Sequence, residues 1–356
     1  MEHISWPAVG PNQGFERRTS TLEAPGSDEV IVEVAGCGVC HTDVSYYEGG
    51  VAPISDWPLV LGHEISGRVV EAGPDCDDWV GKAVVVPAVA PCGACAACKR
   101  GRPTACTRGW MPGNNGPGGF ASHLKVPARG LCPVNEDRLG EVALAELGAV
   151  ADAVTTPLQA TTRAGLREDE VAIIVGVGGI GGFCVQIAKA IGAKVIAIDI
   201  DDGKLSRYAD YCVTTVNARD KDAKALKKEV RGVIKEAGLP GDAWRIFECS
   251  GTGAGQQTAF SLLARGGSLS VVGFSPEVVP VRLSNVMALD AELYGNWGCD
   301  PALYPEAVDM VLSGKIALKE FVELRPLSTI ADVFAAAHSG ELVNRVVLQP
   351  DEGTAS

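Results

Sequence analysis

The chain has 356 residues, 46% of them hydrophobic and 21% charged, which suggests a folded globular protein of two domains. Its formal net charge of −13 argues against nucleic acid or an anionic membrane as a partner, because both repel an acidic surface. The start of the chain has no signal-peptide pattern and no apolar run could span a bilayer, so we expect a cytoplasmic protein whose twelve cysteines stay reduced and serve metal binding.

Short apolar runs follow one another in the first half of the chain. They occupy residues 30–34, 66–71 and 83–86, with glycine and proline turn signals between them. Such closely spaced runs are typical of an antiparallel β domain. We therefore predict a β-rich domain over about residues 29–150.

Two loops in this half carry candidate metal ligands. Cys40 lies in the segment GVCHTD, and His63 follows 23 residues later in GHE. Thiolate and imidazole are both good zinc ligands, and three protein ligands leave a fourth position open for water or an alcohol oxygen. Asp152 is the best candidate for the third ligand. Each residue also has a plainer interpretation: a buried thiol, a core histidine and a helix-capping aspartate.

A second group of cysteines has the spacing C-x2-C-x2-C-x7-C. Four thiolates so close in sequence can surround one Zn²⁺ tetrahedrally. A shell of four sulfurs leaves no open position, so this site is expected to be structural. An iron–sulfur cluster or simple free thiols are the alternatives. The four residues are Cys92, Cys95, Cys98 and Cys106.

The pattern changes over about residues 154–296. Strand-like runs alternate there with segments of helical periodicity, which predicts a doubly wound parallel sheet and an α/β fold. The charged run 220–229 is interpreted as one solvated helix face. The remaining residues, 297–356, return to short mixed elements and end in a strand-like segment. The four strand-like runs of the α/β region are 171–176, 194–200, 245–251 and 268–274.

The first of these strands leads into the segment GVGGIGG and then into a helical stretch, the context that a G-x-G-x-x-G dinucleotide fingerprint requires. Gly176 makes the tight turn, Gly178 lets the backbone approach a pyrophosphate, and Gly181 lets helix and strand pack closely. The free N–H groups of the helix N-terminus favour phosphate. The predicted cofactor-binding residues of this loop are Gly176, Gly178, Gly179, Ile180 and Gly181.

The second strand ends at Asp199, 18 residues after Gly181. A carboxylate there accepts hydrogen bonds from both hydroxyls of the adenosine ribose and repels a 2′-phosphate, so NAD is favoured over NADP. The plainer alternative is a glycine-rich turn beside an ordinary aspartate at the end of a strand.

Together these motifs resemble the zinc-containing medium-chain dehydrogenase/reductase family, in the family's order and over nearly the whole chain. The resemblance implies a GroES-like β-rich catalytic domain built from residues 1–153 and 297–356, with a Rossmann NAD-binding domain at 154–296 between them. It implies two zinc ions per chain, one catalytic and one structural. It also implies a homo-oligomer, dimer or tetramer, joined near residues 285–300.

The resemblance also assigns roles to individual residues. Cys40, His63 and Asp152 would hold the catalytic zinc, with Glu64 as an occasional fourth ligand. Thr42 would hydrogen-bond the substrate oxygen and start the proton relay. The remaining assignments are Asp43 bracing a ligand, Lys204 joining Asp199 at the ribose, and Arg345 reaching the pyrophosphate. One departure is Ser45, which stands where liver-type members have a histidine that passes the proton to solvent, so the cofactor ribose and water would serve instead.

Within the family, five segments are similar to 6-hydroxycyclohex-1-ene-1-carbonyl-CoA dehydrogenases of anaerobic benzoyl-CoA breakdown. That similarity implies NAD-linked oxidation of a ring secondary alcohol carrying a CoA thioester. Lys99, Arg100, Arg102 and Arg108 are the cations available for CoA phosphates. A general secondary-alcohol or polyol dehydrogenase is the first alternative, and a catalytically silent NAD-binding protein is a remote one. The five segments are 118–134, 247–251, 282–288, 295–316 and 333–342.

Overall fold

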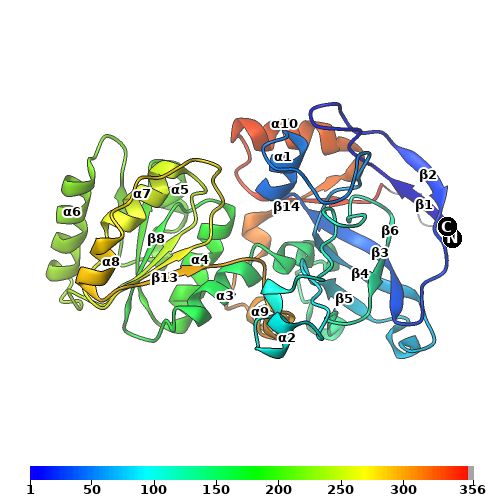
Figure 1. Cartoon of the computed structure of the whole chain (residues 1–356), viewed down its shortest axis with the longest axis horizontal. Helices are drawn as coiled ribbons and strands as arrows, with labels where there is room; N and C mark the ends of the chain where they lie inside the picture. The colour runs from blue at the N-terminus through cyan, green and yellow to red at the C-terminus, as the bar shows by residue number, and fades with distance from the viewer. Residues whose placement is uncertain (352–356) are drawn as a thin grey trace. The chain divides into compact units, whose positions relative to one another are not determined.

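A computed structural model describes residues 1–351 of the chain. The chain forms two compact units (Figure 1). Unit 1 combines Met1–Thr155 with Gly298–Ser356, and unit 2 is Thr156–Trp297. The first unit is therefore built from both ends of the chain, and the second is inserted between them.

Unit 1 is organised around a mixed sheet. Its neighbouring strands run in the order β14-β15-β3-β4-β5-β7, and β6 also pairs with β3. Every pair is antiparallel except β14 and β15. The strands are β3 (Glu29–Gly38), β4 (Glu64–Ala72), β5 (Ala83–Val86), β6 (His123–Pro127), β7 (Cys132–Pro133), β14 (Val322–Pro326) and β15 (Arg345–Gln349).

The predicted β-rich first half is thus confirmed, and each of its three apolar runs lies within a strand. The run at 30–34 is part of β3, in which seven of ten residues are buried and whose backbone pairs with strands along both edges. A separate two-stranded sheet and four helices complete the unit. These are β1 (Glu2–Ser5), β2 (Arg18–Thr21), α1 (His41–Tyr47), α2 (Ala96–Lys99), α9 (Tyr304–Leu312) and α10 (Ile330–Ser339), with short 3₁₀ segments between them.

Unit 2 contains a six-stranded sheet in which all pairs are parallel. The order β10-β9-β8-β11-β12-β13 places the first strand in the middle, which is the Rossmann arrangement. Successive strands are therefore added on one side of β8 and then on the other. Such folds bind ligands at this switch point, between β8 and β11. The strands are β8 (Val171–Val175), β9 (Lys194–Asp199), β10 (Thr214–Asn217), β11 (Arg245–Glu248), β12 (Ser268–Val271) and β13 (Glu292–Gly295).

Helices alternate with these strands along the chain (Figure 1). The charged run at 220–229 leads into α6, in which only Leu226, Val230 and Ile234 are buried, so the predicted solvated helix face is confirmed. None of the helices in the described part of the chain has the length and hydropathy that a membrane span needs. The helices are α3 (Thr155–Arg163), α4 (Gly179–Ile191), α5 (Asp202–Arg207), α6 (Ala223–Glu236), α7 (Gly253–Ser261) and α8 (Ser284–Leu289).

Candidate active site

The predicted catalytic ligands meet in one buried cluster within unit 1. Cys40 is the residue before α1, His63 precedes β4, and Asp152 follows the 3₁₀ segment Leu144–Ala151. The Sγ atom of Cys40 lies 3.4 Å from Oδ2 of Asp152, and Nε2 of His63 lies 3.7 Å from the same oxygen. Together with Glu64, the ligand atoms all lie within 4.8 Å of one another. One sulfur, one nitrogen and one or two carboxylate oxygens at this spacing fit a single zinc ion.

Asp43 organises this cluster through both carboxylate oxygens. Oδ2 accepts from the backbone N–H of Cys40 at 3.0 Å, and Oδ1 accepts from the N–H of Gly62 at 3.0 Å. Oδ1 also lies 3.3 Å from Nδ1 of His63. Burial lowers the pKa of His63, but the Asp43 charge and the hydrogen bonds of Asp43, Asp152 and Cys40 together outweigh it, and the net shift is upward. A fully buried anion therefore fixes the loops of two ligands and faces the ring nitrogen that a metal would leave free.

Glu64 forms a buried ion pair with Arg345, the first residue of β15. Nε of Arg345 lies 2.9 Å from Oε2 of Glu64, and Nη2 contacts Oε1. Nη2 also lies 4.0 Å from Oδ2 of Asp152. Burial raises the pKa of Glu64 to about 7, and the Arg345 guanidinium opposes that rise. The guanidinium therefore offsets part of the negative charge that Cys40, Glu64 and Asp152 bring into the interior.

Thr42, the expected start of the proton relay, lies on α1, and so does Ser45, which replaces the relay histidine. Oγ1 of Thr42 is 3.8 Å from Sγ of Cys40, so its hydroxyl borders the metal cluster. Ser45 follows three residues later and is half-buried, and positions three apart lie on the same face of a helix.

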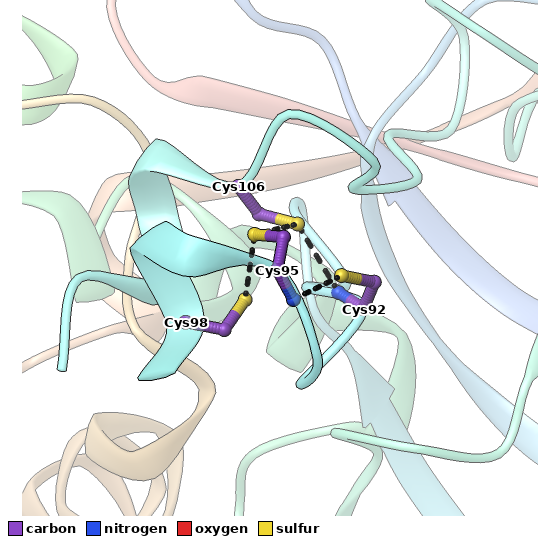
Figure 2. Close-up of side chains that lie close together, drawn as sticks. All are labelled: Cys92, Cys95, Cys98 and Cys106. Atoms are coloured by element: carbon purple, nitrogen blue, oxygen red, sulfur yellow. Dashed lines mark hydrogen bonds between the residues drawn. The ribbon is translucent and has the colours of Figure 1, made fainter. Parts of the chain in front are cut away.

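The four-cysteine group forms a second metal cluster, in the segment 91–109 (Figure 2). Sγ of Cys95 lies 3.6 Å from Sγ of Cys98 and 3.7 Å from Sγ of Cys106. Zn–S bonds of about 2.3 Å in a tetrahedron place the sulfurs roughly 3.8 Å apart. One metal ion therefore fits, whereas the four thiolates of an iron–sulfur cluster are divided among two or four iron atoms and do not all lie this close together.

Backbone N–H groups point at these sulfurs. The N–H of Cys92 donates to Sγ of Cys106 at 3.3 Å, and that of Cys95 donates to Sγ of Cys92 at 3.3 Å. Backbone donors lower the pKa of Cys95 to about 6, whereas burial and the neighbouring thiols raise that of Cys98 to about 11. The backbone donors thus favour the thiolate form, which is the form that binds zinc.

The predicted dinucleotide loop connects β8 to α4 within unit 2. Gly176 has φ +85°, and a Cβ at Gly181 would overlap the Gly176 carbonyl. A Cβ at Gly178 would meet no atom within 4 Å, so there the backbone faces open space. Gly179 and Ile180 are the first two residues of α4. The loop thus leaves room for phosphate at a helix N-terminus.

Asp199 ends β9 beside this loop. Its Oδ2 accepts from the N–H of Val177 at 2.8 Å, and its Oδ1 accepts from Ile200 and Asp201 at 2.7 and 3.0 Å. The carboxylate retains further acceptor capacity. Lys204 lies on α5 with its side chain exposed, and its backbone N–H donates to Asp201. The predicted ribose-binding pair therefore lies on adjacent elements.

One set of contacts near the metal cluster could not be predicted from the sequence. The hydroxyls of Tyr304 and Thr155 both donate to the carbonyl of Ala151, the residue before Asp152. The Tyr304 contact joins residues 153 positions apart. No motif connects them, and Tyr304 looks like an ordinary residue at the start of a helix.

Comparison with known proteins agrees with both units. Residues 26–136 match the family model of the alcohol dehydrogenase GroES-like domain. Residues 179–313 match the model named zinc-binding dehydrogenase. The unit 1 sheet is therefore GroES-like, as predicted.

Three similar proteins illustrate the match. An alcohol dehydrogenase of Geobacillus stearothermophilus is 30% identical over 91% of this chain and 92% of its own. A sorbitol dehydrogenase of Bacillus subtilis is 28% identical over 86% of each chain. A Sinorhizobium meliloti protein described as a zinc-binding dehydrogenase and solved with NADP has a TM-score of 0.85 at 25% identity, over 98% of this chain and 100% of its own. The chain belongs to the zinc-dependent medium-chain alcohol dehydrogenase family, whose members are oxidoreductases acting on CH–OH groups.

Proposed function

We propose that this enzyme oxidises a cyclic secondary alcohol to a ketone, with NAD⁺ as the hydride acceptor and a catalytic zinc held by Cys40, His63 and Asp152. The observation that carries the proposal is the convergence of these three side chains in one buried cluster. Three protein ligands are typical of zinc enzymes that keep a position for substrate. Zinc bound there would act as a Lewis acid and lower the pKa of the substrate hydroxyl.

The chain's own residues have distinct tasks in this proposal. Asp43 holds His63 in the orientation that presents Nε2, and Arg345 keeps the Glu64 carboxylate paired. The hydroxyl of Thr42 accepts the proton that leaves the substrate. Because Ser45 stands where a relay histidine would be, the cofactor ribose and water complete the path to solvent. Asp43 and Arg345 thus maintain the geometry, while the Thr42 hydroxyl starts the proton transfer.

NAD is the preferred cofactor in this proposal. A carboxylate at Asp199 binds the two ribose hydroxyls and repels the 2′-phosphate of NADP. Lys204 supports the same ribose. A contact of Arg345 with the cofactor pyrophosphate remains a prediction. In the structure its guanidinium is paired with the Glu64 carboxylate.

The specific substrate proposed is 6-hydroxycyclohex-1-ene-1-carbonyl-CoA, giving the 6-oxo thioester in anaerobic aromatic degradation. Five segments of the sequence support it by resemblance. Four exposed cations on the cysteine segment provide charge for the CoA phosphates in a chain that is acidic overall. They are Lys99, Arg100, Arg102 and Arg108.

A general secondary-alcohol or polyol dehydrogenase is the second candidate. It is favoured by the similarity to a sorbitol dehydrogenase along most of both chains. The metal, the cofactor and the relay would be the same, and only the substrate pocket would differ.

NADH formation distinguishes the two candidates. The 6-hydroxy thioester would be assayed beside cyclohexanol, 2-butanol and sorbitol, with zinc content measured on the same sample. Rapid turnover of the thioester alone supports the specific substrate. Turnover of the plain alcohols alone rejects it and retains the zinc and NAD chemistry. One zinc per chain without turnover of any substrate would reject the catalytic site itself.

A homo-oligomer formed through the β13 edge also belongs to this proposal. β13 is the last strand of its sheet and has one neighbour, and an open strand edge is a template for pairing with another strand. Apolar side chains of this region are exposed, with Leu293 43% and Met287 75% accessible. Size-exclusion chromatography with light scattering tests the assembly. A cytoplasmic location is proposed from the twelve free thiols.

A further inference from the structure

We propose that Tyr304 is a positioning residue for the catalytic metal, acting through the backbone carbonyl that precedes Asp152 and linking this ligand to the base of the cysteine segment. The inference rests on the proposed function, because it assumes that Asp152 holds zinc. It assigns a task to a buried hydroxyl that belongs to neither metal cluster.

Asp152 is held in place through the backbone of the residue before it. It follows a 3₁₀ segment whose last residue is Ala151, and the final carbonyls of a helix have no partner within the helix. The Ala151 carbonyl accepts two hydroxyls instead, from Tyr304 at 2.6 Å and Thr155 at 2.9 Å. Because the peptide unit is planar, fixing this carbonyl also fixes the direction from which the Asp152 side chain starts.

Tyr304 is itself fixed by contacts within the protein interior. Its side chain is fully buried, and its hydroxyl accepts from the backbone N–H of Ala88 at 2.9 Å while donating to Ala151. Both hydrogen-bonding roles of the phenol are therefore used within the protein interior. Pro305 follows at the second position of α9, where the helix needs no N–H donor, so the helix start that carries Tyr304 is itself well defined.

Ala88 connects Tyr304 to the cysteine segment. Two residues later, Ala90 exchanges backbone hydrogen bonds with Trp110 at 2.7 and 2.9 Å, and this pair closes the base of the segment 91–109 that carries the four cysteines. One phenol thus connects the base of the structural metal segment to the residue before a catalytic metal ligand.

The distances around Asp152 explain why a small displacement of its carboxylate would weaken zinc binding. Its Oδ2 lies 3.4 Å from the Cys40 sulfur and 3.7 Å from the His63 nitrogen. A zinc ion binds its ligands within about 0.2 Å of preferred distances. Losing the Tyr304 hydroxyl leaves the Ala151 carbonyl with one donor and the Ala88 N–H without its acceptor.

The test is Tyr304→Phe, which removes one oxygen atom and keeps the ring. Zinc affinity would be measured by chelator competition on the full-length protein, and the environment of the catalytic site by visible spectra after cobalt substitution. We expect catalytic zinc affinity to fall about ten- to a hundredfold, as with other supports of metal ligands, and the cobalt bands of that site to change. The four-cysteine site keeps its metal and serves as an internal reference.

Tyr47→Phe is the matched control. The Tyr47 hydroxyl accepts from the N–H of Gly14 at 3.1 Å within the same unit, so this variant also removes a phenol bonded to backbone. It should leave both zinc affinities and the cobalt spectrum unchanged. If Y47F loosens the catalytic zinc as much as Y304F does, the effect is general destabilisation and the proposal is overturned.

The proposal is also overturned if Y304F binds both metals as tightly as the parent with the same spectrum. If Y304F does not fold, Thr155→Val decides the question, since it removes the other hydroxyl from the same carbonyl and should loosen the catalytic zinc alone. A parent protein that binds one zinc instead of two would reject the proposed function itself, which separates the two failures.

Discussion

The buried ion pair between Glu64 and Arg345 allows a quantitative prediction. Arg345→Met keeps most of the side-chain volume and removes the charge. The Arg345 and Glu64 side chains are 8% and 0% exposed, so the variant would leave an uncompensated carboxylate in the interior near Asp152. Removing one partner of a buried pair costs about 3–5 kcal/mol. For a protein unit of this size that corresponds to a fall in melting temperature of roughly 6–20 °C.

The assay is urea denaturation of protein stripped of catalytic zinc, so that a freed Glu64 cannot bind the metal instead. Four of the six tryptophans lie in unit 1, so their fluorescence reports on its unfolding; they are Trp6, Trp57, Trp79 and Trp110. The double variant Glu64→Gln with Arg345→Met is the control, since it removes both charges. It should recover about 0.5–3 kcal/mol, the coupling expected for residues in contact.

The deficit of R345M should also depend on pH. In the parent, the pKa of folded Glu64 is already about 7, and without the guanidinium burial raises it further. Between these two pKa values the variant retains a proton on Glu64 that the parent has lost, so the stability deficit grows as pH rises above about 7. We therefore expect a small deficit near pH 5 and a large one above about pH 8. A deficit below roughly 1 kcal/mol at high pH, or a double variant as unstable as R345M, would refute this account of the pair.

Three further outcomes follow from the site. Asp43→Asn turns one carboxylate oxygen into a donor facing backbone N–H, so catalytic zinc should bind about ten- to a hundredfold more weakly in chelator competition; unchanged affinity would contradict the role given to Asp43. Asp199→Ser should narrow the preference for NAD over NADP by at least about tenfold in kcat/KM, with an unaltered ratio counting against the ribose contact. Cys106→Ser should lower zinc content by one ion per chain and leave the catalytic ion bound, and loss of both by metal analysis would show that the sites are not independent.

The sequence predicted those parts of the fold that have strong local periodicity. The run at 83–86 coincides with β5, and the glycine loop lies between β8 and α4 as expected. β10 and β13, with sequences TTVN and ELYG, are absent from the predicted strands. Both are edge strands, each packs against one neighbour and is partly exposed, so neither needs the apolar run that signals a buried strand.

The candidate site was predictable where a ligand belongs to a motif. Cys40 and His63 come from short patterns, and the structure places Asp152 beside them. The ion pair of Arg345 with Glu64 and the contact of Tyr304 with Ala151 were not predictable, because each joins residues far apart in sequence through the packing of the finished sheet. Arg345 was assigned to the cofactor from resemblance alone, and only the structure reveals its carboxylate partner.

The division of unit 1 between the two chain ends has a consequence for biosynthesis. All ligands of the four-cysteine cluster lie within residues 92–106, so this segment can bind its metal soon after it leaves the ribosome. The catalytic cluster needs Arg345 on β15, which emerges only after the whole of unit 2 has been made. Until then Glu64 lacks its Arg345 partner, and the end of β3 at Cys37 and Gly38 lacks its β15 neighbour. The order of synthesis therefore allows the structural ion to bind before the catalytic centre is complete.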